Sequence, residues 1–140
     1  MKNKLIWVFI VIVAINGLLM TACDIDDVSS INGVWQMSGG TRVTVNGSNG
    51  VYSYFGSLDA LWDNARSKNI IKIGDQHWRY LTSTGSLTWS GQTRHVTYTG
   101  STSNATGSTW VNITITLSAN GQSIQVYDHH FGTTRTWTRW

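Results

Sequence analysis

Short runs in which polar and apolar residues alternate, each closed by glycine or asparagine, constrain the fold of this chain more than any other feature. In the clearest run, residues 110–117, the apolar positions are Val111, Ile113, Ile115 and Leu117. Successive side chains of a strand point to opposite faces, so this run predicts a strand with one face in the core. Because such runs follow one another with short turns between them, we expect an all-β domain of antiparallel neighbours, built as a barrel or a sandwich.

Turn signals divide the domain into about eight to ten expected strands. The strongest hairpin signal is the stretch 46–50, Asn-Gly-Ser-Asn-Gly, because these residues tolerate the positive φ of tight turns. Asn120-Gly121 is a second hairpin signal, Ser90-Gly91 indicates a break, and residues 100–107 are predicted to form a loop. The expected strands are 33–37, 41–45, 51–55, 70–73, 77–81, 86–89, 93–98, 110–117, 123–127 and 133–140.

One segment after the third expected strand departs from the strand period. Apolar residues in 57–66 recur three and four positions apart, as they do on one face of a helix. Ser57 is a suitable N-cap, and Asn69 is a suitable end of the helix. The apolar face would consist of Leu58, Leu61, Trp62 and Ala65.

The N-terminus has the pattern of a leader segment. Lys2 and Lys4 precede an apolar run at residues 5–20, and small residues follow it. This order is typical of a secretory signal peptide. The run is shorter than the roughly 20 residues of a spanning helix, and an uncleaved membrane anchor is the alternative.

The four residues Met20-Thr21-Ala22-Cys23 resemble the bacterial lipobox, in which a signal peptidase cuts before a cysteine that carries lipid. Cys23 is the only cysteine, so no disulfide accounts for it. The resemblance implies lipid attachment at Cys23 and a location in the bacterial cell envelope, with the membrane bound through this lipid. The expected segments are a signal peptide at 1–22, an acidic tether at 23–30 and a single β-barrel domain at 31–140.

The tether contains Asp24, Asp26 and Asp27. In enteric bacteria, Asp directly after the lipidated cysteine resembles the signal for retention in the inner membrane, on its periplasmic face. In Bacteroidota, an acidic cluster at this place resembles an export signal to the cell surface. A solvated linker without a signal is the third interpretation, and all three stay open.

Composition favours sheet and argues against some partners. The chain has no Glu and no Pro, whereas Thr, Ser, Gly and Trp are abundant, which suits strands. Removal of the two lysines of the leader would leave eight of the ten basic side chains beside seven acidic ones. No basic stripe remains, so we expect no nucleic-acid partner.

Gly33-Val34-Trp35 at the start of the first expected strand resembles the Gly-x-Trp signature of lipocalins and related calycin barrels. In that family, an Arg near the end of the last strand packs over this Trp and closes the barrel. Arg139 or Arg135 could match it by position. The resemblance implies a small antiparallel up-and-down barrel, with Trp35 and Arg139 as its closing pair. The chain departs from the family in the position of its helix and in having no disulfide.

No catalytic constellation is evident, so we expect no enzyme activity and no cofactor. The suggestive cluster is Asp128-His129-His130, but adjacent residues of a strand point to opposite faces and cannot readily chelate one ion. His95 or His77 could join one of these histidines across strands. The spacing gives no support for the three or four convergent ligands of a metal site, and we predict none.

Tryptophan and tyrosine exceed what a small core must hold, because seven of the eight Trp lie after Cys23. Most should belong to the core, but a few could line a pocket for an apolar molecule or a sugar. We therefore expect a non-catalytic binding module for a small apolar or glycan ligand. The alternative is an interaction, inhibitor or structural lipoprotein that contacts an envelope protein through the outer face of its sheet. The candidate ligand-binding residues are Trp62, Trp78, Trp89, Trp110 and Asn112.

Overall fold

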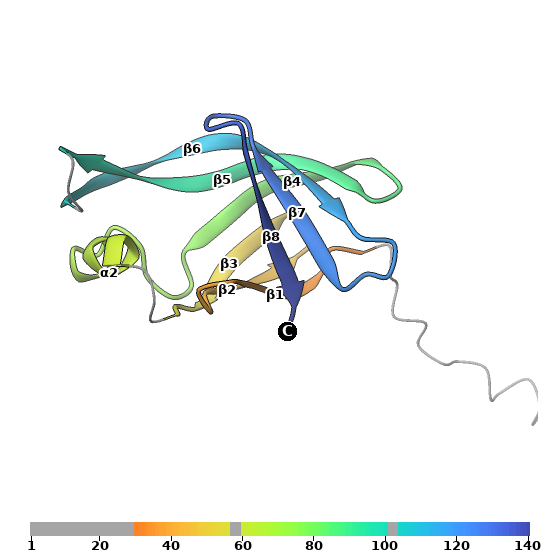
Figure 1. The fold of residues 1–140 in the computed structure, drawn as a ribbon, viewed down its shortest axis with the longest axis horizontal. Helices are drawn as coiled ribbons and strands as arrows, with labels where there is room; N and C mark the ends of the chain where they lie inside the picture. The colour runs from red at the N-terminus through yellow and green to blue at the C-terminus, as the bar shows by residue number, and fades with distance from the viewer. Residues whose placement is uncertain (1–29, 57–59, 101–103) are drawn as a thin grey trace, which may run out of the picture.

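The computed structural model describes residues 30–56, 60–100 and 104–140. Its eight strands form a closed antiparallel barrel in which neighbours along the chain pair and β8 returns to β1 (Figure 1). The predicted all-β up-and-down barrel with a short helix after the third strand is confirmed. The expected signal peptide and Cys23 lie outside the described residues. The strands are β1 (Gly33–Met37), β2 (Arg42–Asn46), β3 (Asn49–Tyr54), β4 (Gln76–Gly85), β5 (Thr88–Thr99), β6 (Asn104–Leu117), β7 (Ser123–Asp128) and β8 (Thr133–Arg139).

The hairpin between β2 and β3 forms where the turn signal predicted it. Asn46 pairs with Asn49, which leaves Gly47 and Ser48 as the turn. Gly47 has a φ of 60°, a left-handed conformation that glycine adopts at little cost. Two-residue hairpin turns require such positive φ values, so local chemistry sets the register of this pair.

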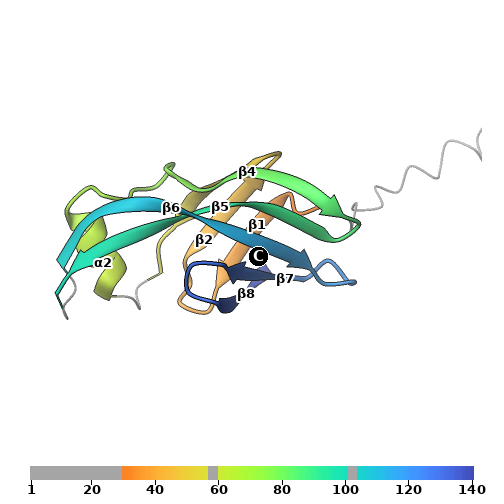
Figure 2. The ribbon, with the colours of Figure 1, turned by 90° about the horizontal axis from the view of Figure 1, so that it is seen from above.

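The strands β5 and β6 form a long ribbon that continues past the barrel toward the helix (Figure 2). The expected break at Ser90-Gly91 is wrong, because β5 runs uninterrupted from Thr88 to Thr99. A Cβ on Gly91 would lie 2.7 Å from Cδ2 of Leu81 and 2.9 Å from the carbonyl oxygen of Arg79. The glycine therefore marks the close approach of β4 and not a turn.

Two further segments differ from the sequence prediction. The expected loop 100–107 is shorter, because β6 begins at Asn104; residues 101–103 lie outside the described part. The expected strand 70–73 is wrong, since these residues form a loop. The N–H of Ile70 donates to the carbonyl of Ala65 at 2.9 Å, and the side chain of Ile71 is fully buried. This apolar stretch therefore ends the helix and fills the core.

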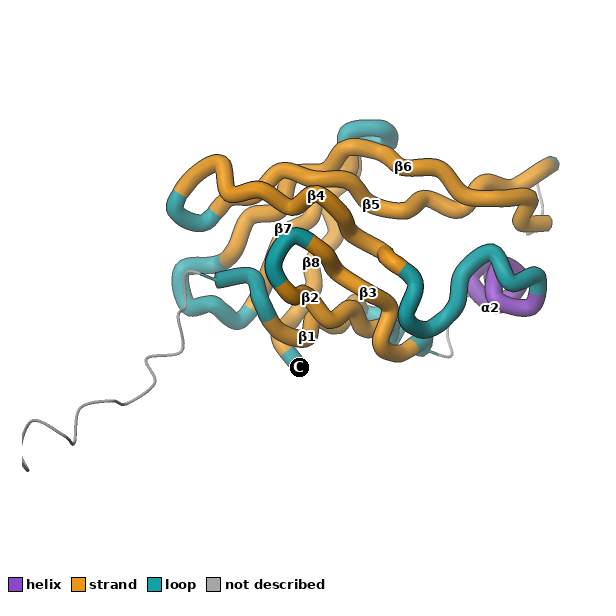
Figure 3. Tube along the Cα trace, turned by 180° about the vertical axis from the view of Figure 1, so that it is seen from behind, coloured by secondary structure: helices purple, strands orange, loops and turns teal. Residues whose placement is uncertain are grey.

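The helix α2 (Ala60–Ser67) packs beside the free end of the β5–β6 ribbon (Figure 3). Asn69 ends it with a φ of 57°, as predicted, whereas the expected cap Ser57 lies outside the described residues. The side-chain oxygen of Asn64 accepts a hydrogen bond from the N–H of Ala105 at 2.8 Å. No helix in the described ranges is long and apolar enough to cross a membrane.

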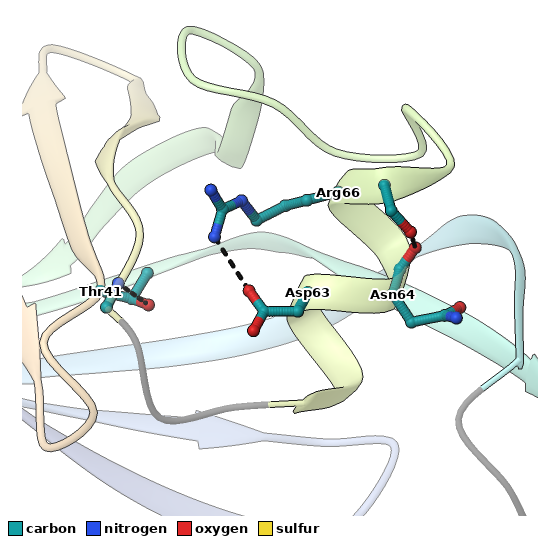
Figure 4. A network of polar contacts seen from close by, with 6 residues as sticks. Thr41, Asp63, Asn64 and Arg66 are labelled. Atoms are coloured by element: carbon teal, nitrogen blue, oxygen red, sulfur yellow. Dashed lines mark hydrogen bonds and ion pairs between the residues drawn. The ribbon is translucent and has the colours of Figure 1, made fainter.

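An ion pair supports α2 on its exposed side. The Arg66 guanidinium lies 3.0 Å from the Asp63 carboxylate one turn earlier, and both side chains face solvent (Figure 4). The same guanidinium lies 4.9 Å from the ring centre of Phe55, which follows β3. These contacts hold α2 near the end of the barrel past which the β5–β6 ribbon extends.

Candidate functional site

One end of the barrel is closed by Trp35 and Arg139. The guanidinium carbon of Arg139 lies 4.6 Å from the ring centre of Trp35, a cation–π distance. The indole N–H of Trp35 donates to the carbonyl of Ile31 at 2.8 Å. Arg139 donates to three backbone carbonyls at 2.9–3.2 Å. These acceptors are the carbonyls of Gly121, Asn32 and Ser30.

Gly33 explains why this closure needs a glycine two residues before the tryptophan. Its φ is 133°, and a Cβ there would lie 2.9 Å from a terminal nitrogen of Arg139. Any side chain would both strain the backbone and displace the guanidinium. Arg139 thus occupies the place that the lipocalin resemblance implied for an arginine, whereas Arg135 lies toward the other end of β8.

A cavity of about 170 Å³ lies at the opposite end of the barrel, where β1 ends at Met37. The inner faces of several strands form its walls, together with Trp62 from α2 and Phe131 from the β7–β8 turn. Its volume is comparable to the roughly 150 Å³ of an apolar cavity that accommodates benzene. The principal side chains around it are Trp62, His77, Trp78, His95, Arg135 and Trp137.

A bulge in β4 brings two consecutive side chains into the barrel. Gly50 of β3 pairs with Trp78 and Val51 pairs with Gln76, so His77 is the extra residue. Such an insertion re-aims a side chain that strict alternation would send to the other face. His77 and Trp78 are consequently both buried.

The His77 ring lies in the middle of an aromatic cluster at the inner end of the cavity. Its centre is 4.6 Å from Tyr52, 5.3 Å from Trp78 and 5.6 Å from Trp137. Trp62 contacts the same histidine at 5.9 Å, so the helix reaches this cluster as well. These tilted and edge-on contacts are the favourable geometries for aromatic pairs.

Burial keeps two groups of the cluster uncharged. It lowers the pKa of His77 to about 3, and the nearby cations Arg135 and Arg94 contribute in the same direction. Burial likewise raises the pKa of the Tyr52 hydroxyl well above its usual value. Near neutral pH, His77 is therefore a neutral imidazole and Tyr52 keeps its proton.

Four buried side-chain polar atoms lack a hydrogen-bond partner among the described residues: Tyr52 Oη, His77 Nδ1, Trp78 Nε1 and Arg94 Nε. His77, Trp78 and Arg94 all line the cavity, and Tyr52 packs against His77. Buried polar groups are nearly always paired in folded proteins. This concentration makes the inner end of the cavity the candidate functional site.

The charged groups near the cavity differ in how they are engaged. Arg94 forms an ion pair with Asp75 at 3.0 Å. The carboxylate of Asp128 accepts hydrogen bonds from the backbone N–H groups of His130 and Phe131, at 2.8 and 3.1 Å, which holds the β7–β8 turn. Burial lowers the pKa of His95, and the negative charge of Asp128 opposes that shift.

The cavity brings together two of the residues predicted to bind a ligand. Trp62 and Trp78 line it, whereas Trp89, Trp110 and Asn112 do not. Trp89 pairs with Ile115 and is partly buried against the core at the other end of β5. The predicted ligand-binding set therefore combines residues of the cavity with a residue packed against the core and two residues of the outer sheet face.

Trp110 and Asn112 lie on the outer face of the sheet, where the alternation of β6 sends them. The guanidinium carbon of Arg79 lies 4.0 Å from the Trp110 ring centre. Arg79 also donates to the side-chain oxygen of Gln92 at 2.9 Å, and Gln92 donates to that of Asn112 at 3.2 Å. The guanidinium carbon of Arg94 also lies 5.5 Å from the Trp110 ring centre, so Arg94 joins this outer network although it is part of the cavity lining.

Sequence reasoning missed several cavity residues. Trp137 and Arg135 lie two and four positions before Arg139, so placing Arg139 beneath the barrel predicts that they share its face. That signal was available in the alternation of β8. No comparable signal existed for His77, because the bulge that turns it inward depends on the pairing with β3.

The two adjacent histidines of the β7–β8 turn, His129 and His130, make separate contacts. His129 Nε2 lies 2.9 Å from the Thr114 hydroxyl, and the His130 ring centre lies 6.0 Å from that of His95. Among the described residues, no group of three or more His, Cys, Asp or Glu side chains could hold a metal ion.

Comparison with protein-family models, curated proteins and solved structures gives no match for this chain.

Proposed function

We propose that this protein is a bacterial envelope lipoprotein, anchored through a lipid on Cys23, whose lipocalin-like barrel binds a small apolar or glycan ligand without catalysis. The observation that carries this proposal is the cavity whose lining includes Trp62, Trp78 and Trp137. Aromatic and aliphatic walls with a few convergent polar groups are the usual composition of small-molecule sites.

The position of the N-terminal end of the domain supports an anchored receptor. Ser30 accepts a hydrogen bond from Arg139 at the closed end of the barrel, and the cavity is at the other end. A lipid a few residues before Ser30 would therefore leave the cavity facing away from the membrane. Both proposed locations, the periplasmic face of the inner membrane and the cell surface, fit this orientation.

The state of His77 supports binding over catalysis. A general base works best when its pKa is near the operating pH, and that of His77 is about 3. Aromatic rings also surround this imidazole. We therefore assign it to the floor of a binding site.

Native mass spectrometry of the protein, purified without added lipid or ligand, tests the binding function. We expect a small retained mass that gentle activation removes. Phe131→Ala should lower its occupancy, because Phe131 lines the mouth of the cavity and is 51% exposed, so its loss should not unfold the barrel. Trp140→Ala, an exposed aromatic outside the cavity, is the matched control. Absence of retained mass, or equal loss in both variants, would contradict the proposal.

Labelling with radioactive palmitate tests the anchor separately. The wild-type protein should incorporate the label and fractionate with membranes, and Cys23→Ser should lose both properties. Equal labelling of the two forms would show that a residue other than Cys23 carries the lipid.

A second candidate function is contact with an envelope protein through the outer face of the sheet. Tyr80 favours this function, because its side chain is 66% exposed. Its φ is 56°, a backbone conformation that is energetically unfavourable for a residue with a bulky side chain. Arg79 beside it stacks on Trp110. A photo-crosslinking residue at position 80 should then capture one envelope protein in living cells, and the same probe at Tyr54 on β3 should not.

A further inference from the structure

Buried polar atoms are hydrogen-bonded at one end of the barrel and unpaired at the other, and this difference limits the chemical class of the ligand. At the closed end, the indole N–H of Trp35 and the three nitrogens of Arg139 all find carbonyl partners. At the cavity, Trp78 Nε1 and His77 Nδ1 have none among the described residues. A molecule bound in the cavity can supply the missing partners.

The unpaired atoms are mainly donors. An indole N–H, as in Trp78, can only donate a hydrogen bond. The neutral His77 ring can donate or accept according to its tautomer. A ligand that satisfies this set must present acceptor oxygens at the inner end of the cavity.

Charge at the cavity favours an acceptor that is anionic. Arg94 is neutralised by Asp75, and the carboxylate of Asp128 is engaged by the backbone of its own turn. Arg135 is different, because its only contact among the described hydrogen bonds and ion pairs is with the Met37 sulfur at 3.9 Å. A guanidinium that is exposed at the mouth and has no carboxylate partner is a good site for a carboxylate oxygen.

The size and walls of the cavity limit the rest of the molecule. A volume of about 170 Å³ holds a single ring but not a long acyl chain or an oligosaccharide. The rings of Trp78 and Trp137 meet at 69° with their centres 5.1 Å apart, so the walls offer flat apolar faces. A planar ring buries more surface against such faces than a hydroxylated sugar, which would also need many more hydrogen bonds.

We propose that the cavity binds a small planar carboxylate, with its ring packed against the aromatic side chains that line the cavity and its oxygens accepting hydrogen bonds from the unpaired donors of the lining and from Arg135. This inference rests on the proposed binding function and names its ligand class.

Isothermal titration calorimetry of the full-length protein with benzoate, toluene and glucose tests the inference. Benzoate carries both the ring and the acceptor, toluene carries the ring alone, and glucose carries hydroxyls without a flat apolar face. We expect benzoate to bind at least about tenfold more tightly than toluene, the difference expected for one charge-assisted hydrogen bond, and glucose to bind most weakly.

Arg135→Gln separates the acceptor contact from the apolar contact. We expect benzoate affinity to fall about tenfold, while toluene affinity stays unchanged because the ring contacts remain. Arg42→Gln, an arginine of β2 outside the cavity that donates to Gln36 and stacks on Trp140, is the matched control and should leave both affinities unchanged.

The outcomes distinguish this inference from the function on which it rests. Equal affinities for benzoate and toluene, or equal benzoate affinity in wild type and Arg135→Gln, would overturn the carboxylate and leave a binding cavity. Preference for glucose would overturn it in favour of a sugar ligand. If none of the probes binds, the inference fails, and the retained-mass experiment decides the binding function independently.

Discussion

Trp35 and Trp78 lie at opposite ends of the same barrel, and both are fully buried. The indole N–H of Trp35 donates to the carbonyl of Ile31 at 2.8 Å, whereas that of Trp78 has no partner among the described residues. The arginines also differ, since Arg139 donates to backbone carbonyls at the closed end, whereas Arg135 at the cavity contacts only the Met37 sulfur among the hydrogen bonds and ion pairs of the described residues. Chemically similar side chains therefore complete the fold at one end and leave donors unpaired at the other.

This difference separates residues that stabilise the barrel from residues that remain available to a ligand. Satisfied buried polar groups rigidify a structure, whereas unsatisfied ones cost stability until something binds. The closed end should therefore dominate the free energy of unfolding, and the cavity should dominate binding. Four measurements test that division.

Trp35→Ala should have the largest effect, a loss of about 3–5 kcal/mol in the free energy of unfolding, because a large side chain leaves a cavity in the core. Urea denaturation followed by circular dichroism measures it. Trp140→Ala is the control: Trp140 is 67% exposed and stacks on Arg42, so its loss should cost less than about 1 kcal/mol. Similar losses in the two variants would mean that the burial of Trp35 does not stabilise the barrel.

Acid should destabilise the cavity end through His77. The unfolded imidazole has a pKa near 6.5 and the folded one about 3, so between these values the unfolded state binds more protons. The free energy of unfolding should thus fall as pH drops from about 6.5 toward 3, by a total on the order of 4 kcal/mol from this group.

The control for this prediction is the comparison of two histidine variants across the same pH range. His77→Phe should remove most of the acid-dependent loss, whereas His129→Gln, at an exposed position, should keep it. If both variants retain the wild-type slope, acid sensitivity arises elsewhere.

Gly33→Ala should cost about 2–3 kcal/mol, because the new Cβ would meet Arg139 at 2.9 Å and the backbone has a φ of 133°. Gly47→Ala is a matched control with positive φ but open space around it, and should cost about 1 kcal/mol. Denaturant midpoints compare the two. Equal costs would show that displacement of Arg139 contributes nothing.

The smallest effect isolates a single hydrogen bond. Replacement of Trp35 or Trp78 by phenylalanine removes a similar side-chain volume. Only Trp35→Phe breaks a hydrogen bond and leaves the Ile31 carbonyl without a partner. We expect Trp35→Phe to cost about 1–2 kcal/mol more than Trp78→Phe in ligand-free protein. Equal losses would indicate that Trp78 Nε1 finds a partner in solution.

Several elements could be predicted because their signals are local. The turn at Gly47 follows from the φ that a tight hairpin requires, and the end of α2 follows from Asn69. The alternation in β6 correctly sent Ile113 and Ile115 to the core and Trp110 to the outer face. The contact between Trp35 and Arg139 agrees with what the resemblance of Gly33-Val34-Trp35 to the lipocalin signature implies.

Other predictions failed where a residue's role depends on distant chain. Gly91 has the sequence signature of a turn, yet it serves the close approach of β4 at Leu81. Residues 70–73 have strand composition, but the N–H of Ile70 is used to end α2. In both cases a tertiary contact decided between two structures that the local residues allow.

The sequence by itself determined the all-β class, the strand faces, the tight turn and the helix after the third strand, because these follow from the conformational preferences of neighbouring residues. Only the tertiary structure decided that His77 and Trp78 both face inward, since the bulge in β4 exists only against β3. It likewise placed Trp62, Trp137 and Arg135 around one cavity. Side-chain period is a local property, whereas register and enclosure arise from strands that meet across the barrel.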